Sequence, residues 1–157
     1  MYSIASYGKM LADRVRVDAY AAALEAVVRP GCVVLELGTG PGFFALLAAR
    51  LGAGKIYAIE PDDVILTARA VAEHNGLAER IELIQARSSE VDLPEPADVM
   101  VSDLRGVLPL FDDHLPSIAY ARERHLKPDG ILIPQRDDLR AAIVEAPDLY
   151  RRKVVAG

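Results

Sequence analysis

The stretch VVLELGTGPG at residues 33–42 decides the fold of this chain. Its first half is a short apolar run interrupted only by Glu36, and such a run is typical of a strand buried on both faces of a parallel sheet. Glycine then occupies alternate positions at Gly38, Gly40 and Gly42, and an apolar helical pattern follows directly. Glycine lets the backbone turn tightly and approach a ligand where a Cβ would clash. Strand, glycine turn and helix in this order predict a nucleotide-binding unit.

The spacing of the glycines and one later acid narrow the choice of ligand. A dinucleotide fingerprint requires a third glycine three positions after the second, where this chain has Phe43. An NAD-dependent enzyme is therefore disfavoured. The second predicted strand, residues 55–59, leads into Glu60, whose carboxylate can accept hydrogen bonds from both hydroxyls of a ribose. The structural alternative is a glycine turn that serves tight packing alone.

Composition restricts the class of protein. The chain has 157 residues, 52% of them hydrophobic, which suits one domain built on a buried parallel sheet. A net charge of −5 argues against a non-specific nucleic-acid binder, and no apolar run reaches the length of a membrane span. Without a signal-peptide pattern at the N-terminus, a cytoplasmic location is expected. No histidine and cysteine residues have metal-ligand spacing, so no metal is predicted.

The order of the predicted elements indicates the fold class. Strands and helices alternate along the chain, which predicts an α/β, doubly wound, Rossmann-like sheet. The predicted strands are residues 32–37, 55–59, 80–85, 97–102 and 131–133. Helices are predicted at residues 10–29, after the glycine turn to about residue 51, from residue 61 to 75, and from Asp112 or Asp113 to about His125. Residues 127–130 are predicted to form a turn and residues 139–144 one more strand.

Several segments together resemble the catalytic domain of protein arginine methyltransferases, a family of class I S-adenosylmethionine (SAM) methyltransferases. The matching segments are MLADRVR at 10–16, LELGTGPG at 35–42, IYAIE at 56–60, DVMVSD at 98–103 and LKPDGILIP at 126–134. The resemblance implies a Rossmann-like domain of the class I type, with SAM as cofactor and S-adenosylhomocysteine as product. It divides the chain into an N-terminal helical lid (1–30), a SAM-binding domain (31–134) and the start of a C-terminal β region (135–157).

The same resemblance implies which residues contact the cofactor. Arg16 would pair with the methionine carboxylate of SAM, for which a guanidinium fork is suited, and Met10 would lie near the sulfonium. The structural alternatives are a surface arginine on an amphipathic helix and a methionine in the core. The full set of implied cofactor-binding residues is Met10, Arg16, Glu36, Gly38, Thr39, Gly40, Gly42, Glu60, Pro61, Ser88 and Ser89.

The acceptor side departs from the family. Arginine methyltransferases have two glutamates that hold the substrate guanidinium, one after the fourth strand and one nine positions later; the aligned residues here are Asp103 and Asp112. Both keep a carboxylate and each is one methylene shorter. Asp112 could instead cap a helix, since aspartate is a preferred N-cap residue. Asp103, at the carboxyl end of a strand beside the cofactor crevice, is the stronger catalytic candidate.

The resemblance implies direct methyl transfer to an arginine-like nitrogen on a protein. The shorter acids and an intervening Arg105 keep open a small-molecule N- or O-methyltransferase of the same family. A third alternative is a cofactor-binding domain without turnover. The family also has a β-barrel after this domain, and no tryptophan of its Thr-His-Trp loop occurs in this chain, so we expect the chain to stop before the barrel. A homodimer is expected for the full-length form.

Overall fold

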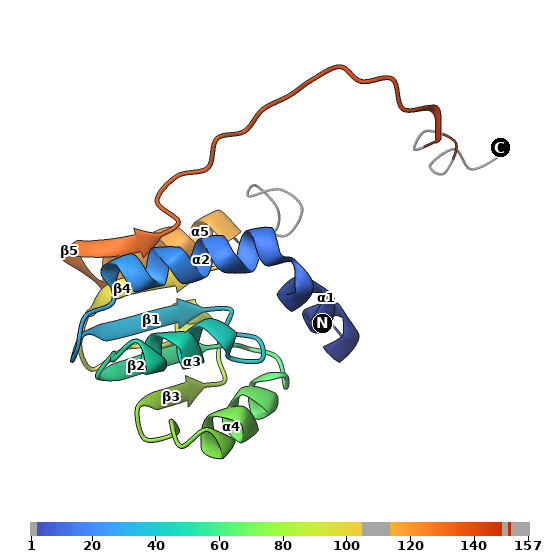
Figure 1. Ribbon diagram of the computed structural model, residues 1–157. Helices are drawn as coiled ribbons and strands as arrows, with labels where there is room; N and C mark the ends of the chain where they lie inside the picture. Colours follow the sequence, from blue (N-terminus) through green and yellow to red (C-terminus); the bar gives the residue numbers. More distant parts are fainter. Residues whose placement is uncertain (1–2, 105–113, 149–150, 152–157) are drawn as a thin grey trace.

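The computed structural model describes residues 3–104, 114–148 and 151 of the 157-residue chain. Within these residues five parallel strands form one sheet in the order β3-β2-β1-β4-β5 (Figure 1). The strands are β1 (Val33–Leu37), β2 (Lys55–Ile59), β3 (Ile81–Ile84), β4 (Ala97–Ser102) and β5 (Leu126–Ile133). The helices are α1 (Ile4–Ala12), α2 (Arg14–Val27), α3 (Phe43–Arg50), α4 (Ile65–His74) and α5 (His114–His125), with a 3₁₀ turn η1 (Ser88–Glu90). The predicted α/β, doubly wound, Rossmann-like fold is confirmed.

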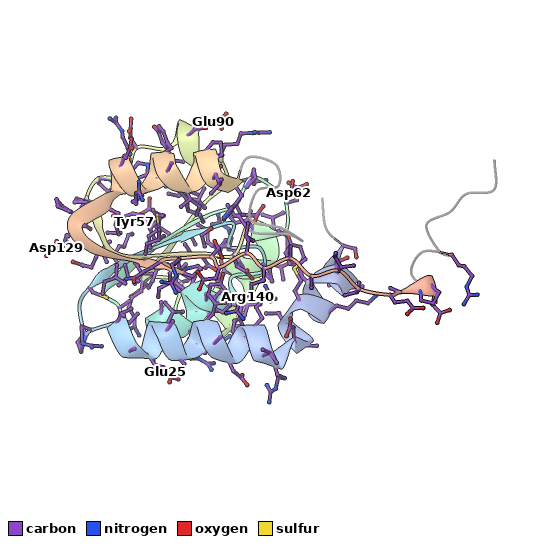
Figure 2. All side chains as sticks on the ribbon, turned by 90° about the horizontal axis from the view of Figure 1, so that it is seen from above. Glu25, Tyr57, Asp62, Glu90, Asp129 and Arg140 are labelled. Carbon is purple, nitrogen blue, oxygen red and sulfur yellow. The ribbon has the colours of Figure 1, made fainter. Side chains whose placement is uncertain are left out.

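Helices cover both faces of the sheet, and the strands alternate their side chains between two cores. Val34 and Ile56 pack with Leu24 of α2 in the core that also includes residues of α3 and α4. Leu35 and Tyr57, their neighbours along the strands, pack in the core on the α5 side. Figure 2 shows the sheet edge-on between α2 and α5. Because the central strands β1, β2 and β4 are buried on both faces, they are predominantly apolar, as the sequence predicted.

The strand order places two loops side by side. β1 is paired with β2 on one side and with β4 on the other. The chain therefore leaves β1 toward β2 and β3, then crosses to the opposite side to form β4 and β5. A crevice for a ligand forms at such a switch point, outside the carboxyl ends of the strands. The glycine turn after β1 and Asp103 after β4 both lie at this point.

The N-terminal helical region differs from the prediction in its start and in its continuity. The sequence predicts one helix over residues 10–29, whereas the structure has α1 from Ile4 and a separate α2, divided at Asp13. The carboxylate of Asp13 accepts a hydrogen bond from the backbone N–H of Arg16 at 3.2 Å and so caps the start of α2. A side-chain cap satisfies amide groups that a continuous helix would bind through its carbonyls. The division into residues 1–30, 31–134 and 135–157 stays a prediction.

Two departures concern the last third of the chain. The expected strand at residues 139–144 is wrong for this structure, because residues 135–146 have no regular structure and run away from the sheet (Figure 1). A strand requires a partner, and the described residues place none beside this segment. The predicted turn at residues 127–130 lies inside β5, where it interrupts the pairing between Ala97–Leu126 and Val99–Ile131. The expected helix start at Asp112 or Asp113 lies outside the described residues.

Two glycines offer a matched test of packing at the turn. Gly42 has φ +85°, and a Cβ there would lie 2.8 Å from the Cβ of Ala68 on α4. Gly76 has φ +65° and no heavy atom within 4 Å of the same position. Gly76→Ala therefore carries only the left-handed backbone cost of about 1–2 kcal/mol. Gly42→Ala adds overpacking, so we expect it to lower the free energy of unfolding by roughly 2–4 kcal/mol. Urea denaturation followed by circular dichroism measures both, and equal losses would contradict the close packing on α4.

Candidate functional site

The glycine turn is bound to the end of the neighbouring strand. Gly38, Gly40 and Gly42 all have positive φ, at 69°, 51° and 85°. Residues that carry a side chain rarely adopt this backbone conformation. The backbone N–H groups of Gly38 and Thr39 both donate to the carbonyl of Ile59, at 2.8 and 3.1 Å. The turn is thereby fixed to the carboxyl end of β2, directly before Glu60.

Glu36 holds the turn from inside the protein. Its side chain is buried, and one oxygen, Oε2, accepts from the hydroxyl of Thr39 at 2.5 Å and from the backbone N–H of Ala45 at 2.8 Å. These contacts join the end of β1, the turn and the first residues of α3. Burial raises the pKa of Glu36 to about 8, although the two hydrogen bonds act in the opposite direction. Sequence reasoning assigned Glu36 to cofactor binding, and the structure shows it engaged with the turn itself.

Glu60 holds the turn from the other side. Its Oε2 accepts from the backbone N–H of Gly40 at 2.9 Å, and its Oε1 accepts from that of Asp62 at 3.1 Å. Burial raises the pKa of this carboxyl, and the two backbone hydrogen bonds oppose that rise. Each carboxylate oxygen has a second lone pair, so both can still accept a hydrogen bond from a ribose hydroxyl.

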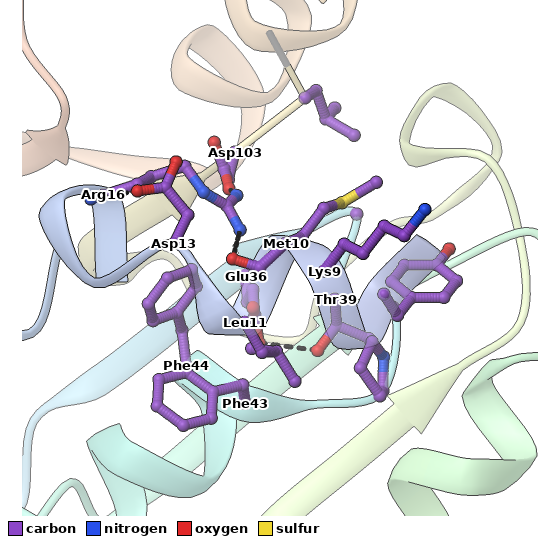
Figure 3. Close-up of a pocket in the computed structure, with 15 residues that line it drawn as sticks. Lys9, Met10, Leu11, Asp13, Arg16, Glu36, Thr39, Phe43, Phe44 and Asp103 are labelled. Atoms are coloured by element: carbon purple, nitrogen blue, oxygen red, sulfur yellow. Dashed lines mark hydrogen bonds and ion pairs between the residues drawn. The ribbon is translucent and has the colours of Figure 1, made fainter. Parts of the chain in front are cut away.

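A cavity of about 540 Å³ lies above the turn, within the size range of small-molecule sites (Figure 3). Residues of α1, the start of α2, the glycine turn and the end of β4 line it. Its lining includes the predicted residues Met10, Arg16, Glu36, Gly38, Thr39, Gly40 and Asp103. Other predicted residues do not line it: Gly42, Glu60, Pro61, Ser88 and Ser89. Asp112 and Arg105 lie outside the described residues.

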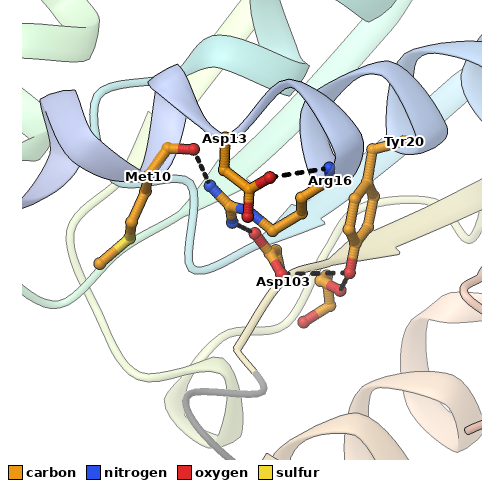
Figure 4. Close-up of polar contacts among 6 residues, drawn as sticks. Met10, Asp13, Arg16, Tyr20 and Asp103 are labelled. Carbon is orange, nitrogen blue, oxygen red and sulfur yellow. Dashed lines mark hydrogen bonds and ion pairs between the residues drawn. The ribbon is translucent and has the colours of Figure 1, made fainter.

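Arg16 and Asp103, predicted to bind different ligands, pair with one another (Figure 4). Nη1 of Arg16 forms an ion pair with Oδ2 of Asp103, and its Nη2 donates to the carbonyl of Met10 at 2.6 Å. The two side chains are 27% and 17% exposed, so the pair faces the cavity while largely shielded from water. A ligand carboxylate entering the cavity would meet a guanidinium that is already shared with Asp103.

Sequence reasoning missed Tyr20 of α2. The hydroxyl of Tyr20 lies 3.2 Å from Oδ1 of Asp103 and 3.1 Å from the carbonyl oxygen of Ser102. One signal could have found it: Tyr20 follows Arg16 by four positions, and residues four apart on a helix lie on the same face. The position of Arg16 therefore indicates that Tyr20 is the other side chain of α2 that points at the end of β4.

Sequence reasoning also missed two side chains that cover the glycines. A Cβ added to Gly40 would lie 2.7 Å from the ring of Tyr7 on α1. A Cβ added to Gly38 would clash with the side chain of Leu104. The absence of side chains at these two positions lets Tyr7 and Leu104 lie directly over the turn.

The described ranges contain neither a cluster of potential metal ligands nor a helix that could span a membrane. No group of three or more His, Cys, Asp or Glu side chains in residues 3–104, 114–148 and 151 is placed to hold a metal ion. None of the helices in that part of the chain combines the length and the apolar character needed to cross a bilayer.

Known proteins match this chain in sequence. The family model for ribosomal protein L11 methyltransferase (PrmA) matches residues 20–151. Protein arginine N-methyltransferase PRMT10 of Oryza sativa subsp. japonica is 39% identical over 148 residues, which are 93% of this chain and 39% of that protein. Protein arginine N-methyltransferase 1 of Schizosaccharomyces pombe is 36% identical over 123 residues, or 78% of this chain and 36% of that protein.

Solved structures match the fold. Protein arginine methyltransferase 10 of Arabidopsis thaliana, in an open conformation, has a TM-score of 0.79 at 36% identity and covers 83% of this chain and 38% of its own. The Trypanosoma brucei PRMT1 enzyme–prozyme heterotetramer with AdoHcy has a TM-score of 0.76 at 29% identity, covering 80% of this chain and 40% of its own. This chain thus spans about two fifths of the length of the relatives it matches.

The buried carboxyl of Glu36 makes stability depend on pH. The unfolded carboxyl ionises near pH 4.5 and the folded one near pH 8, so between these values unfolding releases a proton. Stability therefore falls as pH rises through this window, by at most about 1.4 kcal/mol per pH unit. Glu36→Gln should remove the contribution of Glu36 and leave that of Glu60, whose pKa burial also raises. The amide oxygen of the new side chain can replace Oε2 as the acceptor for Thr39 and Ala45. Urea denaturation at pH 5, 6.5 and 8 measures the slope, with the exposed Glu79→Gln as control; an unchanged slope would contradict the assignment.

Proposed function

This chain belongs to the methyltransferase family that the ribosomal protein L11 methyltransferase model describes, and on that premise we propose that it binds SAM above its glycine turn and methylates a nitrogen acceptor. One observation supports this most directly: a single cavity joins the glycine turn to the carboxylate of Asp103. The proposed acceptor is an arginine-like guanidinium on a protein. Relatives named as protein arginine methyltransferases, up to 39% identical, favour that acceptor class.

The residues proposed to hold the cofactor have suitable chemistry. Gly38 and Gly40 have no Cβ at the points where Leu104 and Tyr7 lie close to the turn, and Glu60 presents two oxygens at the end of β2. Arg16 is the proposed partner of the cofactor carboxylate, and Met10 the proposed neighbour of the sulfonium. Contacts from Glu36, Thr39, Gly42, Pro61, Ser88 and Ser89 belong to the same proposal.

The residues around the acceptor act by orientation and charge. SAM supplies a methyl group that is already activated on a sulfonium, so the chain needs no nucleophile of its own. Asp103 would hold the guanidinium by charge-assisted hydrogen bonds, with Asp112 as the proposed second acid. Methyl transfer depends on alignment, and about 1 Å of misplacement can cost on the order of 100-fold in rate. The fixed position of Asp103, bound through both oxygens, suits that requirement.

The ion pair of Asp103 with Arg16 also favours a second candidate function. An acid already neutralised by an arginine suits an uncharged acceptor, as in a small-molecule N- or O-methyltransferase. A cofactor-binding domain without turnover is the third alternative. The homodimer and the cytoplasmic location stay predictions, which light scattering and cell fractionation would test.

Removal of Glu60 tests the cofactor site. We expect wild type to bind SAM and S-adenosylhomocysteine but not NAD, and Glu60→Ala to weaken both by at least about tenfold. The reason is the loss of the ribose acceptor together with the hydrogen bond to Gly40, each contributing on the order of 1 kcal/mol or more. Isothermal titration calorimetry measures the affinities, with Glu73→Ala on the exposed side of α4 as control. Wild-type binding of NAD, or full affinity in Glu60→Ala, would contradict the proposed site.

Removal of the charge on Asp103 tests the acceptor. For a guanidinium acceptor, Asp103→Asn should lower kcat with an arginine-containing peptide by about 100-fold or more. Its affinity for S-adenosylhomocysteine should be equal or higher, because Arg16 no longer shares its charge with an acid. Radiolabelled methyl transfer and calorimetry measure the two quantities. Near-normal turnover of an uncharged small molecule by Asp103→Asn would support the second function instead.

A further inference from the structure

The carboxylate of Asp103 is held by two residues of α2 that lie one helical turn apart. Arg16 pairs with Oδ2, and the hydroxyl of Tyr20 lies 3.2 Å from Oδ1 (Figure 4). Arg16 and Tyr20 are four positions apart and share one face of the helix. Both carboxylate oxygens of Asp103 are therefore in contact with side chains of one helix, α2.

The position of the Tyr20 hydroxyl is fixed by packing. Its ring stacks on Phe44 with a centroid distance of 4.9 Å and an interplanar angle of 29°. Phe44, in α3, is itself buried and packs edge-on against Phe43, whose side chain lines the cavity. These ring contacts restrict the movement of the Tyr20 side chain relative to Asp103.

The hydroxyl has one proton and two acceptors within reach. The carbonyl oxygen of Ser102 lies at 3.1 Å and Oδ1 of Asp103 at 3.2 Å. A phenol carries a single O–H, so rotation of that hydrogen alone moves the donated bond from one acceptor to the other. An ionised carboxylate forms a hydrogen bond roughly twice as strong as a neutral carbonyl does, so the hydroxyl favours Oδ1 over the Ser102 carbonyl once Arg16 no longer neutralises Asp103.

Under the proposed function, Arg16 has a second negatively charged partner. One guanidinium would then face two carboxylates, that of Asp103 and that of the cofactor, and a single positive charge does not neutralise both. As Arg16 turns toward the cofactor carboxylate, Asp103 becomes a more exposed negative charge in a partly shielded site. That charge is what a cationic acceptor needs, provided that the carboxylate keeps its orientation.

We propose that Tyr20 is a positioning residue that holds Asp103 in place while Arg16 binds the cofactor carboxylate. This inference rests on the proposed SAM site. Tyr20 keeps the orientation of the carboxylate through the exchange, and so couples occupancy of the cofactor site to the charge offered to a guanidinium.

The test compares two ligands in the Tyr20→Phe variant, which keeps the ring on Phe44 and removes only the hydroxyl. One ligand is S-adenosylhomocysteine, and the other is its decarboxylated analogue, which keeps the amine. Calorimetry should show that Tyr20→Phe weakens binding of S-adenosylhomocysteine about tenfold, since Asp103 then retains Arg16 more strongly. Binding of the decarboxylated analogue should change less than about twofold, because the analogue has no carboxylate to pair with Arg16.

A double-mutant cycle separates positioning from pocket shape. In an Asp103→Asn background, Tyr20→Phe should have no further effect on S-adenosylhomocysteine affinity. Tyr57→Phe is the matched control, since it removes another hydroxyl that lies 3.3 Å from a carboxylate, that of Glu95. Equal weakening of both ligands, an unchanged affinity for S-adenosylhomocysteine, or the same loss with Asp103→Asn would overturn the inference. Wild type that binds neither ligand would instead overturn the proposed function, and the inference with it.

Discussion

Two buried carboxyl groups fix the glycine turn, and the rest of the site depends on them. Glu36 binds the Thr39 hydroxyl and the first turn of α3 from below, while Glu60 binds the amide of Gly40 from the side. Acidic side chains are rarely buried unless such partners satisfy them. Here they replace hydrogen bonds that the left-handed backbone of the turn could not make internally. These hydrogen bonds hold the turn in place, and the turn forms one side of the cavity.

The wall of the cavity comes from the crossing of the chain at β1. Because β4 is added on the side of β1 opposite to β2, its carboxyl end delivers Asp103 beside the glycine turn. The helix α2 packs over the same edge and brings Arg16 and Tyr20 to that carboxylate. Two elements that are far apart in the sequence, α2 and β4, therefore determine one ion pair and one hydrogen bond.

The family match and the geometry of the site support different conclusions. The match over residues 20–151 establishes a methyltransferase family, and the fold follows that of arginine methyltransferases at a TM-score of 0.79. The chain covers about two fifths of those relatives, so the proposed acceptor rests on the local chemistry of Asp103, Arg16 and Tyr20.

The sequence by itself determined the sheet, the glycine turn and the acid after β2, because these depend on local patterns: apolar runs, glycine spacing and strand ends. It also identified Arg16 and Asp103 through resemblance to a family. It did not predict that they pair, that Asp13 divides the N-terminal helix, or that residues 135–146 leave the sheet. Only the tertiary structure decided the pairing and the role of Tyr20, because both depend on side chains of α2 that meet the end of β4, and Tyr20 and Asp103 are 83 positions apart.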